Sequence, residues 1–330
     1  MAGTSGAIWV VAETNADGSL ARIGGEVATL ARTLAKAASV DAAGIVVGAD
    51  PKAAATELAT YLPRVVAVTD ATAADHAWAA IAAQRAAEVI AAEGPTLILT
   101  GASPDGRDVA GTLMALLHGA VLVNATAVTW DNAESVEMSV FGGKLVTTSR
   151  FVEAAGVRII TVRPNVVAAE PAGSAGTVEA LTPKGELALP AVKVVDRIEE
   201  ASAAAPIEEA RIIVAGGRGV GGEEGFALVR QIAERLGGAV GATRAAVDSG
   251  WIPYAQQIGQ TGKIVKPKLY LALGISGSIQ HKVGMQTAET IIAVNRDPDA
   301  PIADFADMIV IGDLFDVGTA LLEKLKSRAG

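Results

Sequence analysis

Short runs of β-branched residues alternate with longer alanine-rich stretches along the first 120 residues of the chain. The apolar runs lie near 7–13, 44–49, 64–70 and 95–101, and the helix-like stretches lie near 27–37, 51–62, 74–92 and 107–117. A strand followed by a helix and another strand is the repeating unit of parallel sheets, which carry helices on both faces. The first part of the chain is therefore predicted to form an α/β domain with a mostly parallel sheet.

The spacing of the strands changes after residue 120. Three closely spaced apolar runs follow, near 121–130, 135–150 and 157–164. Gly142 and Gly143 suit the tight turn of a hairpin. We therefore expect antiparallel strands added at the edge of the parallel sheet.

A stretch rich in alanine and glutamate at 199–210 shows no apolar periodicity. Such stretches join domains, so we place the linker there. An N-terminal domain over 1–199 and a second domain over 206–330 are expected, and the total of 330 residues is long enough for two cores.

The second domain also alternates strands and helices. Its apolar runs lie near 211–217, 239–243, 268–274, 290–295 and 308–313. They predict a doubly wound parallel sheet. The runs end at glycine, serine and aspartate, and ligands bind beyond the carboxyl ends of parallel strands.

The composition excludes several kinds of site. The chain has no cysteine, and its three histidines, His76, His118 and His281, are scattered. Without cysteine there is no disulfide, iron–sulfur cluster or cysteine nucleophile, so any redox role depends on an organic cofactor. A net charge of −9 without a basic cluster argues against a nucleic-acid partner. With no signal peptide and no apolar run of about 18 residues, we expect a bacterial-type cytoplasmic protein that does not enter a membrane.

A glycine-rich turn at Gly216–Gly222 follows the first strand of the second domain and precedes a helix. Backbone N–H groups in such a turn bind phosphate. A dinucleotide site also needs an acidic residue at the end of the next strand, where this chain has Ala242, Thr243 and Arg244. An NAD site is therefore the weaker interpretation, and the alternative is that the glycines serve only the geometry of the turn.

The most informative segment is Leu269–Asn295, in which an apolar strand runs into the turn Gly274–Gly277. Ser276 is expected to cap a helix that contains Gln280 and His281. The turn presents N–H and hydroxyl donors to an anion, and pyrophosphate is the ligand that suits it. The alternative is that Ser276 is only a helix cap and His281 a surface residue.

This segment has a motif longer than a phosphate-binding turn. It consists of a strand, Gly-Ile-Ser-Gly, Gln-His, a glycine three positions later, and Ile-x-Ala-Val-Asn. The alpha subunits of electron transfer flavoproteins share this motif, and the chain resembles that family. Further matching runs are Thr243–Asp248, Gly259–Lys263, Asn295–Ile302 and Gly312–Leu314. The strong resemblance covers about 206–330, and the first 200 residues match only in their α/β pattern and in Gly106-Arg107-Asp108.

The resemblance implies FAD bound in an extended form by the second domain. Arg218 and Arg244 would supply positive charge that favours the one-electron-reduced anion of the flavin. His281 would direct its imidazole at the pyrimidine side of the ring, where negative charge accumulates on reduction. Gln260 and Thr261 would lie near N5, with the threonine hydroxyl as a hydrogen-bond partner.

The other implied contacts concern the pyrophosphate and the adenosine. Thr243, where many relatives have serine, would hold the pyrophosphate region together with Ser276, Gly277 and Asn295, and Asp313 would accept hydrogen bonds from the ribose. No catalytic or metal-binding residue is expected. The full set of expected FAD contacts is Arg218, Thr243, Arg244, Ile258, Gly259, Gln260, Thr261, Ser276, Gly277, Ser278, Ile279, Gln280, His281, Asn295, Asp313 and Leu314.

The same resemblance implies a heterodimer. A beta subunit that binds AMP would contact the first domain, whose nucleotide-binding-like fold would itself be empty. The complex would carry electrons in fatty acid β-oxidation from flavin dehydrogenases, such as acyl-CoA dehydrogenases, to a quinone oxidoreductase or another acceptor, and would not act as an enzyme. Two alternatives remain: an NAD-dependent dehydrogenase with His281 as acid or base, and a nucleotide-binding adapter without redox activity.

Overall fold

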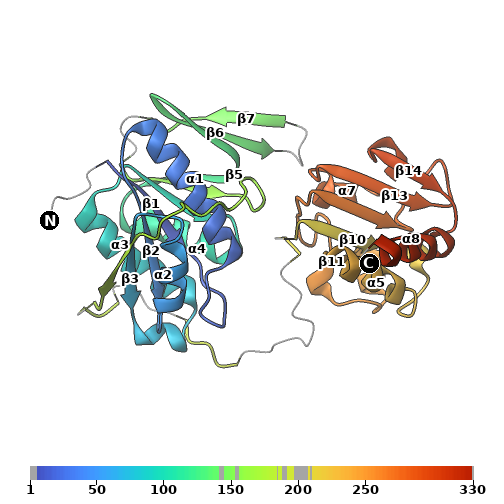
Figure 1. Ribbon diagram of the computed structural model, residues 1–330, viewed down its shortest axis with the longest axis horizontal. Helices are drawn as coiled ribbons and strands as arrows, with labels where there is room; N and C mark the ends of the chain where they lie inside the picture. Colours follow the sequence, from blue (N-terminus) through green and yellow to red (C-terminus); the bar gives the residue numbers. More distant parts are fainter. Residues whose placement is uncertain are drawn as a thin grey trace. The chain divides into compact units, whose positions relative to one another are not determined.

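The chain forms two compact units that meet in the sequence between Ile198 and Glu199, and each is described by itself (Figure 1). The structure is a computed structural model, and it describes residues 6–140, 145–152, 156–183, 185–187, 192–196, 207–208 and 210–328. The hairpin turn expected at Gly142 and Gly143 lies outside the described residues, as do most of the expected linker and the expected start of the second domain at 206.

The described part of the first unit contains a nine-stranded sheet with the strand order β7-β6-β5-β8-β4-β1-β2-β3-β9. From β5 to β9 in this order, every strand is parallel to its neighbours. At the other end of the sheet, β6 is antiparallel to both β5 and β7. The strands are β1 (Ile8–Ala12), β2 (Ala42–Gly48), β3 (Arg64–Thr69), β4 (Leu97–Gly101), β5 (Ala120–Asp131), β6 (Ala133–Val140), β7 (Leu145–Ser149), β8 (Arg158–Val162) and β9 (Thr177–Leu181).

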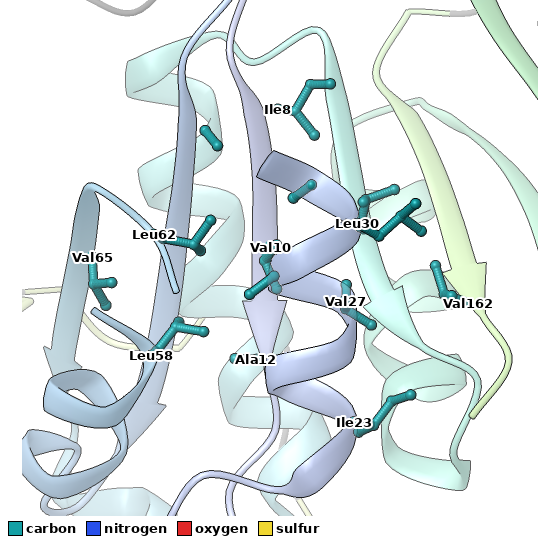
Figure 2. Close-up of a cluster of buried hydrophobic side chains, with 14 of the residues drawn as sticks. Ile8, Val10, Ala12, Ile23, Val27, Leu30, Leu58, Leu62, Val65 and Val162 are labelled. Atoms are coloured by element: carbon teal, nitrogen blue, oxygen red, sulfur yellow. The ribbon is translucent and has the colours of Figure 1, made fainter. Parts of the chain in front are cut away.

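Different helices cover the two faces of this sheet. Ile8 and Val10 of β1 point to the face covered by α1 and α2 (Figure 2), and Trp9 points to the face covered by α3 and α4. Every residue of β1 is buried, because a central parallel strand is covered on both faces. The helices are α1 (Arg22–Ala38), α2 (Lys52–Leu58), α3 (Trp78–Glu93) and α4 (Pro104–Leu116).

The strands after residue 120 differ from the expectation at one place. β6 and β7 are antiparallel strands at the edge, as expected, but β8 lies inside the sheet between β4 and β5 and is parallel to both. Its residues Ile159 and Ile160 are fully buried in the cores on opposite faces. β5 makes this arrangement possible, because it pairs in parallel with β8 over its first half and antiparallel with β6 over its second, with a bulge between them.

The second unit is a doubly wound parallel sheet in the order β11-β10-β12-β13-β14. Phe226 of α5 and Leu322 of α8 pack on one face, and Tyr270 and Met285 belong to the core on the other. The fold class predicted from the sequence is therefore confirmed. The elements are β10 (Ile212–Gly216), α5 (Phe226–Leu236), β11 (Ala239–Ala242), α6 (Arg244–Asp248), β12 (Leu269–Leu273), α7 (Ile279–Met285), β13 (Thr290–Asn295), β14 (Met308–Ile311) and α8 (Leu314–Arg328).

Short 3-10 turns lie at Ala71–Ala74, Arg218–Val220, Tyr254–Gln256 and Pro301–Asp304. Among the helices, α4 begins three residues before the predicted start, because the hydroxyl of Ser103 accepts a hydrogen bond from the Gly106 N–H at 2.9 Å and caps it. None of the helices in the described part of the chain is both long and apolar enough to cross a membrane.

Candidate functional site

A cavity of about 660 Å³ opens in the second unit, where the strand order reverses between β10 and β12. Ligands bind at this place in open parallel sheets because the loops diverge there. Its volume lies within the range of small-molecule and cofactor sites. The lining residues are Gly217, Arg218, Gly219, Thr243, Arg244, Ala245, Asp248, Ile258, Gly259, Gln260, Thr261, Gly274, Ile275, Ser276, Gly277, Ser278, Gln280, His281, Val294, Asn295, Arg296, Asp297, Ala300, Pro301, Gly312 and Leu314.

The glycines of the two turns allow their backbones to approach each other. A Cβ at Gly219 would lie 2.7 Å from the Cα of Gly274, and a Cβ at Gly277 would lie 2.5 Å from the Ile302 nitrogen. Gly274 and Gly277 also have φ values of 62° and 83°, a region that disfavours residues with a side chain. The geometry of the turns therefore requires these glycines in the absence of any ligand, and the N–H groups of Gly219 and Gly274 are bonded to backbone carbonyls within the fold.

Thr243 and Arg244 stand at the carboxyl end of β11. The hydroxyl oxygen of Thr243 is buried and has no hydrogen-bond partner among the described residues. An unsatisfied buried hydroxyl is costly unless a ligand completes it. Arg244 is mostly exposed and pairs with Asp248 at 3.2 Å. A phosphate-bearing cofactor would satisfy the hydroxyl and bring negative charge beside the guanidinium, so these residues fit such a group.

The loop around Gly259 forms another wall. Its φ of 144° leads the backbone past α7, and a Cβ there would lie 2.9 Å from the Gln280 carbonyl oxygen. The Gln260 N–H donates to the same carbonyl at 2.8 Å. The Thr261 hydroxyl and carbonyl oxygens accept from the side-chain amide of Gln257. The loop is therefore ordered by internal hydrogen bonds, while the side chains of Gln260 and Thr261 are exposed beside the cavity.

The helix cap after β12 is not the one expected. The N-cap position of α7 belongs to Ser278, and neither this serine nor Ser276 forms a side-chain cap. The carbonyl of Ser276 accepts a hydrogen bond from the Ile302 N–H at 3.0 Å, which holds the turn against the 3-10 turn after β13. The cap assigned to Ser276 was therefore wrong, because the turn continues for two residues beyond it.

His281 is buried, so its interpretation as a surface residue was wrong. Only 4% of its surface is exposed. Its Nδ1 lies 3.0 Å from the Ile258 carbonyl oxygen and its Nε2 lies 2.9 Å from the Tyr270 hydroxyl. Burial lowers the pKa of His281 to about 4. The imidazole is therefore neutral at neutral pH, and both of its nitrogens are bonded within the protein.

Of the expected contact residues, Ile279 and Asp313 do not line the cavity. Ile279 is 76% exposed. Asp313 pairs with Arg296 and accepts from the Phe315 N–H at the start of α8, and the Arg296 hydrogen bond lowers the pKa of Asp313. Asn295 donates its side-chain amide to the Ile275 carbonyl at 2.9 Å, which fixes it at the cavity wall.

All other expected residues line one cavity, although they lie at or beyond the carboxyl ends of five different strands, β10 to β14. Two residues of the cavity lining, Arg296 and Asp248, were not among the expected contacts. Both lie in runs that matched the family, Asn295–Ile302 and Thr243–Asp248. Sequence reasoning also missed Tyr270. No local pattern distinguishes this tyrosine from the apolar residues of β12, because its hydroxyl acts across the sheet face on a residue of α7.

Comparisons with known proteins cover both units. Residues 8–185 match the family model described as "Electron transfer flavoprotein domain", and residues 206–286 match "Electron transfer flavoprotein FAD-binding domain". The chain is 40% identical to the electron transfer flavoprotein subunit alpha of Mycobacterium leprae (95% of this chain, 96% of the relative) and to that of Mycobacterium tuberculosis H37Rv (96% and 97%). The subunit alpha of Thermoanaerobacterium thermosaccharolyticum is 36% identical, with 97% of each chain covered.

The resemblance that the sequence showed over 206–330 thus extends to the first unit. The match to the FAD-binding family lies in the unit that holds the cavity, and the orphaned Thr243 hydroxyl fits a phosphate-bearing cofactor. FAD is therefore the cofactor, and the NAD-dependent and non-redox alternatives are not favoured. The chain belongs to the electron transfer flavoprotein alpha-subunit family.

Proposed function

We propose that this chain holds FAD at the β10/β12 switch point as one subunit of a two-subunit electron carrier, and that it performs no chemistry on a substrate. The observation behind the proposal is the cavity of about 660 Å³, which is lined by the glycine turns and the Thr243 hydroxyl. When bound, FAD supplies the transfer of electrons. The protein's contribution is to bind and orient the cofactor and to set the charge around it.

The lining residues divide into two groups by their chemistry. The hydroxyls of Thr243 and Ser276 offer donors to the pyrophosphate, together with backbone N–H groups of the turns at Gly217–Gly219 and Gly274–Gly277. The N–H groups of Gly217, Gly219 and Gly274 are not among these donors, because they are bonded to carbonyls within the fold. Arg218 and Arg244 are exposed and bring fixed positive charge to the rim. A guanidinium stays charged at any physiological pH, so it favours negative charge on a reduced flavin.

The state of His281 supports the absence of substrate chemistry. A general acid or base needs a nitrogen within reach of the reacting proton and a pKa near the working pH. Both nitrogens of His281 are bonded to Ile258 and Tyr270, and burial lowers its pKa to about 4. It is therefore a poor acid or base for a dehydrogenase.

The partners follow from the family. We place an AMP-binding beta subunit beside the first unit, flavin dehydrogenases such as acyl-CoA dehydrogenases as donors, and a quinone oxidoreductase as acceptor. Matching relatives are named as alpha subunits, which supports a second subunit. A cytoplasmic location is part of the proposal.

The experiment is a visible spectrum of the chain co-expressed with the neighbouring gene product, followed by stepwise anaerobic reduction. A yellow heterodimer that accepts electrons one at a time from a dehydrogenase supports the proposal. A colourless heterodimer would contradict FAD binding. A yellow protein that oxidises a small substrate without a second protein would contradict the carrier role.

A further inference from the structure

The side chain of Gln257 is buried at the base of the loop that carries Thr261. Only 2% of the Gln257 surface is exposed. Its backbone N–H donates to the Tyr254 carbonyl at 2.9 Å, and its carbonyl accepts from the Lys263 N–H at 2.7 Å. Gln257 does not line the cavity, whereas Thr261 lines it and is exposed. Gln257 is therefore fixed behind the cavity wall and can act on the cavity only through the loop.

The orientation of the Gln257 amide follows from its neighbours. Its Nε2 lies 3.0 Å from the carbonyl oxygen of Thr261 and 3.1 Å from the hydroxyl oxygen of the same residue. A carbonyl oxygen can only accept a hydrogen bond, so the NH₂ end of the amide must face Thr261. This NH₂ group has two protons, one for each oxygen. The hydroxyl oxygen of Thr261 is therefore an acceptor in this contact.

The proton of the Thr261 hydroxyl remains available. A threonine hydroxyl has one proton and two lone pairs, and the Gln257 amide occupies a lone pair. In the described part of the chain, the hydroxyl forms no hydrogen bond other than this one. Because the side chain stands at the cavity wall, the proton is left for a ligand in the cavity.

We propose that Gln257 is a positioning residue, which keeps the Thr261 hydroxyl oxygen as an acceptor and so leaves its proton to be donated to an acceptor atom of the flavin ring. The proposal rests on the assignment of this cavity to FAD. A hydrogen bond to an acceptor atom strengthens as that atom gains negative charge. The hydroxyl thereby favours a ring that has taken up an electron, and Gln257 influences the cofactor without touching it.

The backbone of the loop does not depend on the Gln257 amide. The Tyr254 hydroxyl also donates to the Thr261 carbonyl, at 2.8 Å. The Gly262 N–H donates to the Gly259 carbonyl at 3.1 Å and closes the turn. Loss of the Gln257 amide therefore releases the Thr261 hydroxyl, while the other hydrogen bonds keep the course of the loop.

The first test is Thr261→Val in the heterodimer loaded with ¹³C- and ¹⁵N-labelled FAD. Valine keeps the shape of threonine and loses the hydroxyl, so the NMR signal of one acceptor atom of the flavin should move. The first electron should be accepted about tenfold less readily, which is a potential lower by about 59 mV. Thr261→Ser keeps a hydroxyl and should retain the wild-type signal. If no flavin signal moves in Thr261→Val, the proposal is overturned.

The second test is Gln257→Met, alone and combined with Thr261→Val. Methionine has a shape close to that of glutamine and no donor, so the same flavin signal should move, and the first electron should be accepted about threefold less readily. In the Thr261→Val background the substitution should have no further effect, because Gln257 acts through the hydroxyl. An equal effect in both backgrounds would overturn the proposal. Gln84→Met, at a buried glutamine of the first unit, is the matched control and should change neither quantity.

A third measurement leaves Gln257 in place, and so does not depend on the folding of a Gln257 variant. The side-chain amide signal of Gln257 in the ¹⁵N-labelled chain should shift in Thr261→Val, because one of its protons loses its acceptor. An unchanged amide signal would overturn the proposal. A wild-type heterodimer without flavin would overturn the proposed function together with this inference, whereas a flavin-loaded wild type whose variants fail these tests would overturn this inference alone.

Discussion

At the reversal of strand order between β1 and β4 the first unit carries a buried carboxylate, whereas at the reversal between β10 and β12 the second unit has a cavity. In the first unit Glu13 follows β1 and is 8% exposed, and its Oε2 accepts from the Ser103 hydroxyl at 2.5 Å. A Cβ at Gly106, in the first turn of α4, would lie 2.7 Å from the other oxygen of Glu13. The chain's own negative charge therefore stands at the helix N-terminus, where a phosphate is stabilised in other proteins.

The second unit has the same strand-order reversal and different residues at the strand ends. Gly216 ends β10 and Gly217 follows it, and Thr243, directly after β11, has a buried hydroxyl without a partner among the described residues. The comparison teaches that the topology provides the place for a ligand, and that the residues at the strand ends decide which charge and which donors stand there. It also gives a physical reason why the first unit's nucleotide-binding-like fold is expected to be empty.

Adding a side chain in the second crevice should have the largest effect on stability. Gly277→Ala places a Cβ 2.5 Å from the Ile302 nitrogen at a φ of 83°, so strain and overpacking together should lower the free energy of unfolding by about 4 kcal/mol. Gly221→Ala is the control, because its φ of 82° is similar and nothing lies within 4 Å of the added Cβ. Denaturant unfolding and FAD content check both variants. Equal losses would show that backbone strain alone, and not the close approach, decides the site.

Acid should weaken the second unit through His281. Its pKa is about 4 in the folded chain against a usual value of 6.5, so between these values the unfolded chain binds the extra proton and stability falls as the pH falls. This proton uptake changes the free energy of unfolding by about 3 kcal/mol in total. The stabilisation is complete above pH 6.5 and is lost by about pH 4. Unfolding curves of wild type and His281→Gln across this window measure it. Parallel pH profiles of the two proteins would argue against a buried neutral imidazole.

Removing the negative charge of Glu13 from the first crevice should have a moderate effect on stability. Glu13→Gln keeps the shape and loses the carboxylate beside α4, which should cost about 1–2 kcal/mol of stability. Glu137→Gln on the exposed surface of β6 is the control. FAD content should stay at the wild-type level in both variants. A loss of FAD in Glu13→Gln would show that the first crevice affects cofactor binding in the second unit.

The smallest effect on stability is expected for Arg244→Gln. Its pair with Asp248 is exposed, so stability should change by less than about 0.5 kcal/mol. The flavin should accept its first electron less readily, with a potential lower by about 60 mV, which is a tenfold change in the equilibrium. Arg230→Gln on α5 is the control, and potentiometry of the heterodimer is the measurement. A potential that did not move would remove Arg244 from the charges that act on the cofactor.

The sequence was most informative where backbone geometry restricts residue choice. The turns at Gly216–Gly222 and Gly274–Gly277 were predicted at strand ends and lie there, because positive φ and close approach exclude other residues. The exact cap of α7 was not predictable, since Ser276 and Ser278 are chemically equal candidates. The buried state of His281 was also hidden, because it depends on Tyr270 and Ile258, which are distant in sequence.

The position of β8 was missed for a related reason. Its apolar run fits both an edge strand and a core strand, and the choice depends on β5, which changes its pairing from parallel to antiparallel at a bulge. Long-range pairing of this kind leaves no local signal. The burial of Ile159 and Ile160 on opposite faces is visible only once the sheet is assembled.

The strand β9 determines where the first half of the gene can be cut. β9 pairs in parallel with β3 at the far edge of the sheet, and Glu179 forms a 2.9 Å ion pair with Arg64 across that pair. A fragment ending before Thr177 would leave β3 with a free row of backbone donors and acceptors, and unprotected edges of this kind pair with other molecules. Fragments of the first unit should therefore extend through Leu181 if the buried strand β3 is to keep its pairing on both sides.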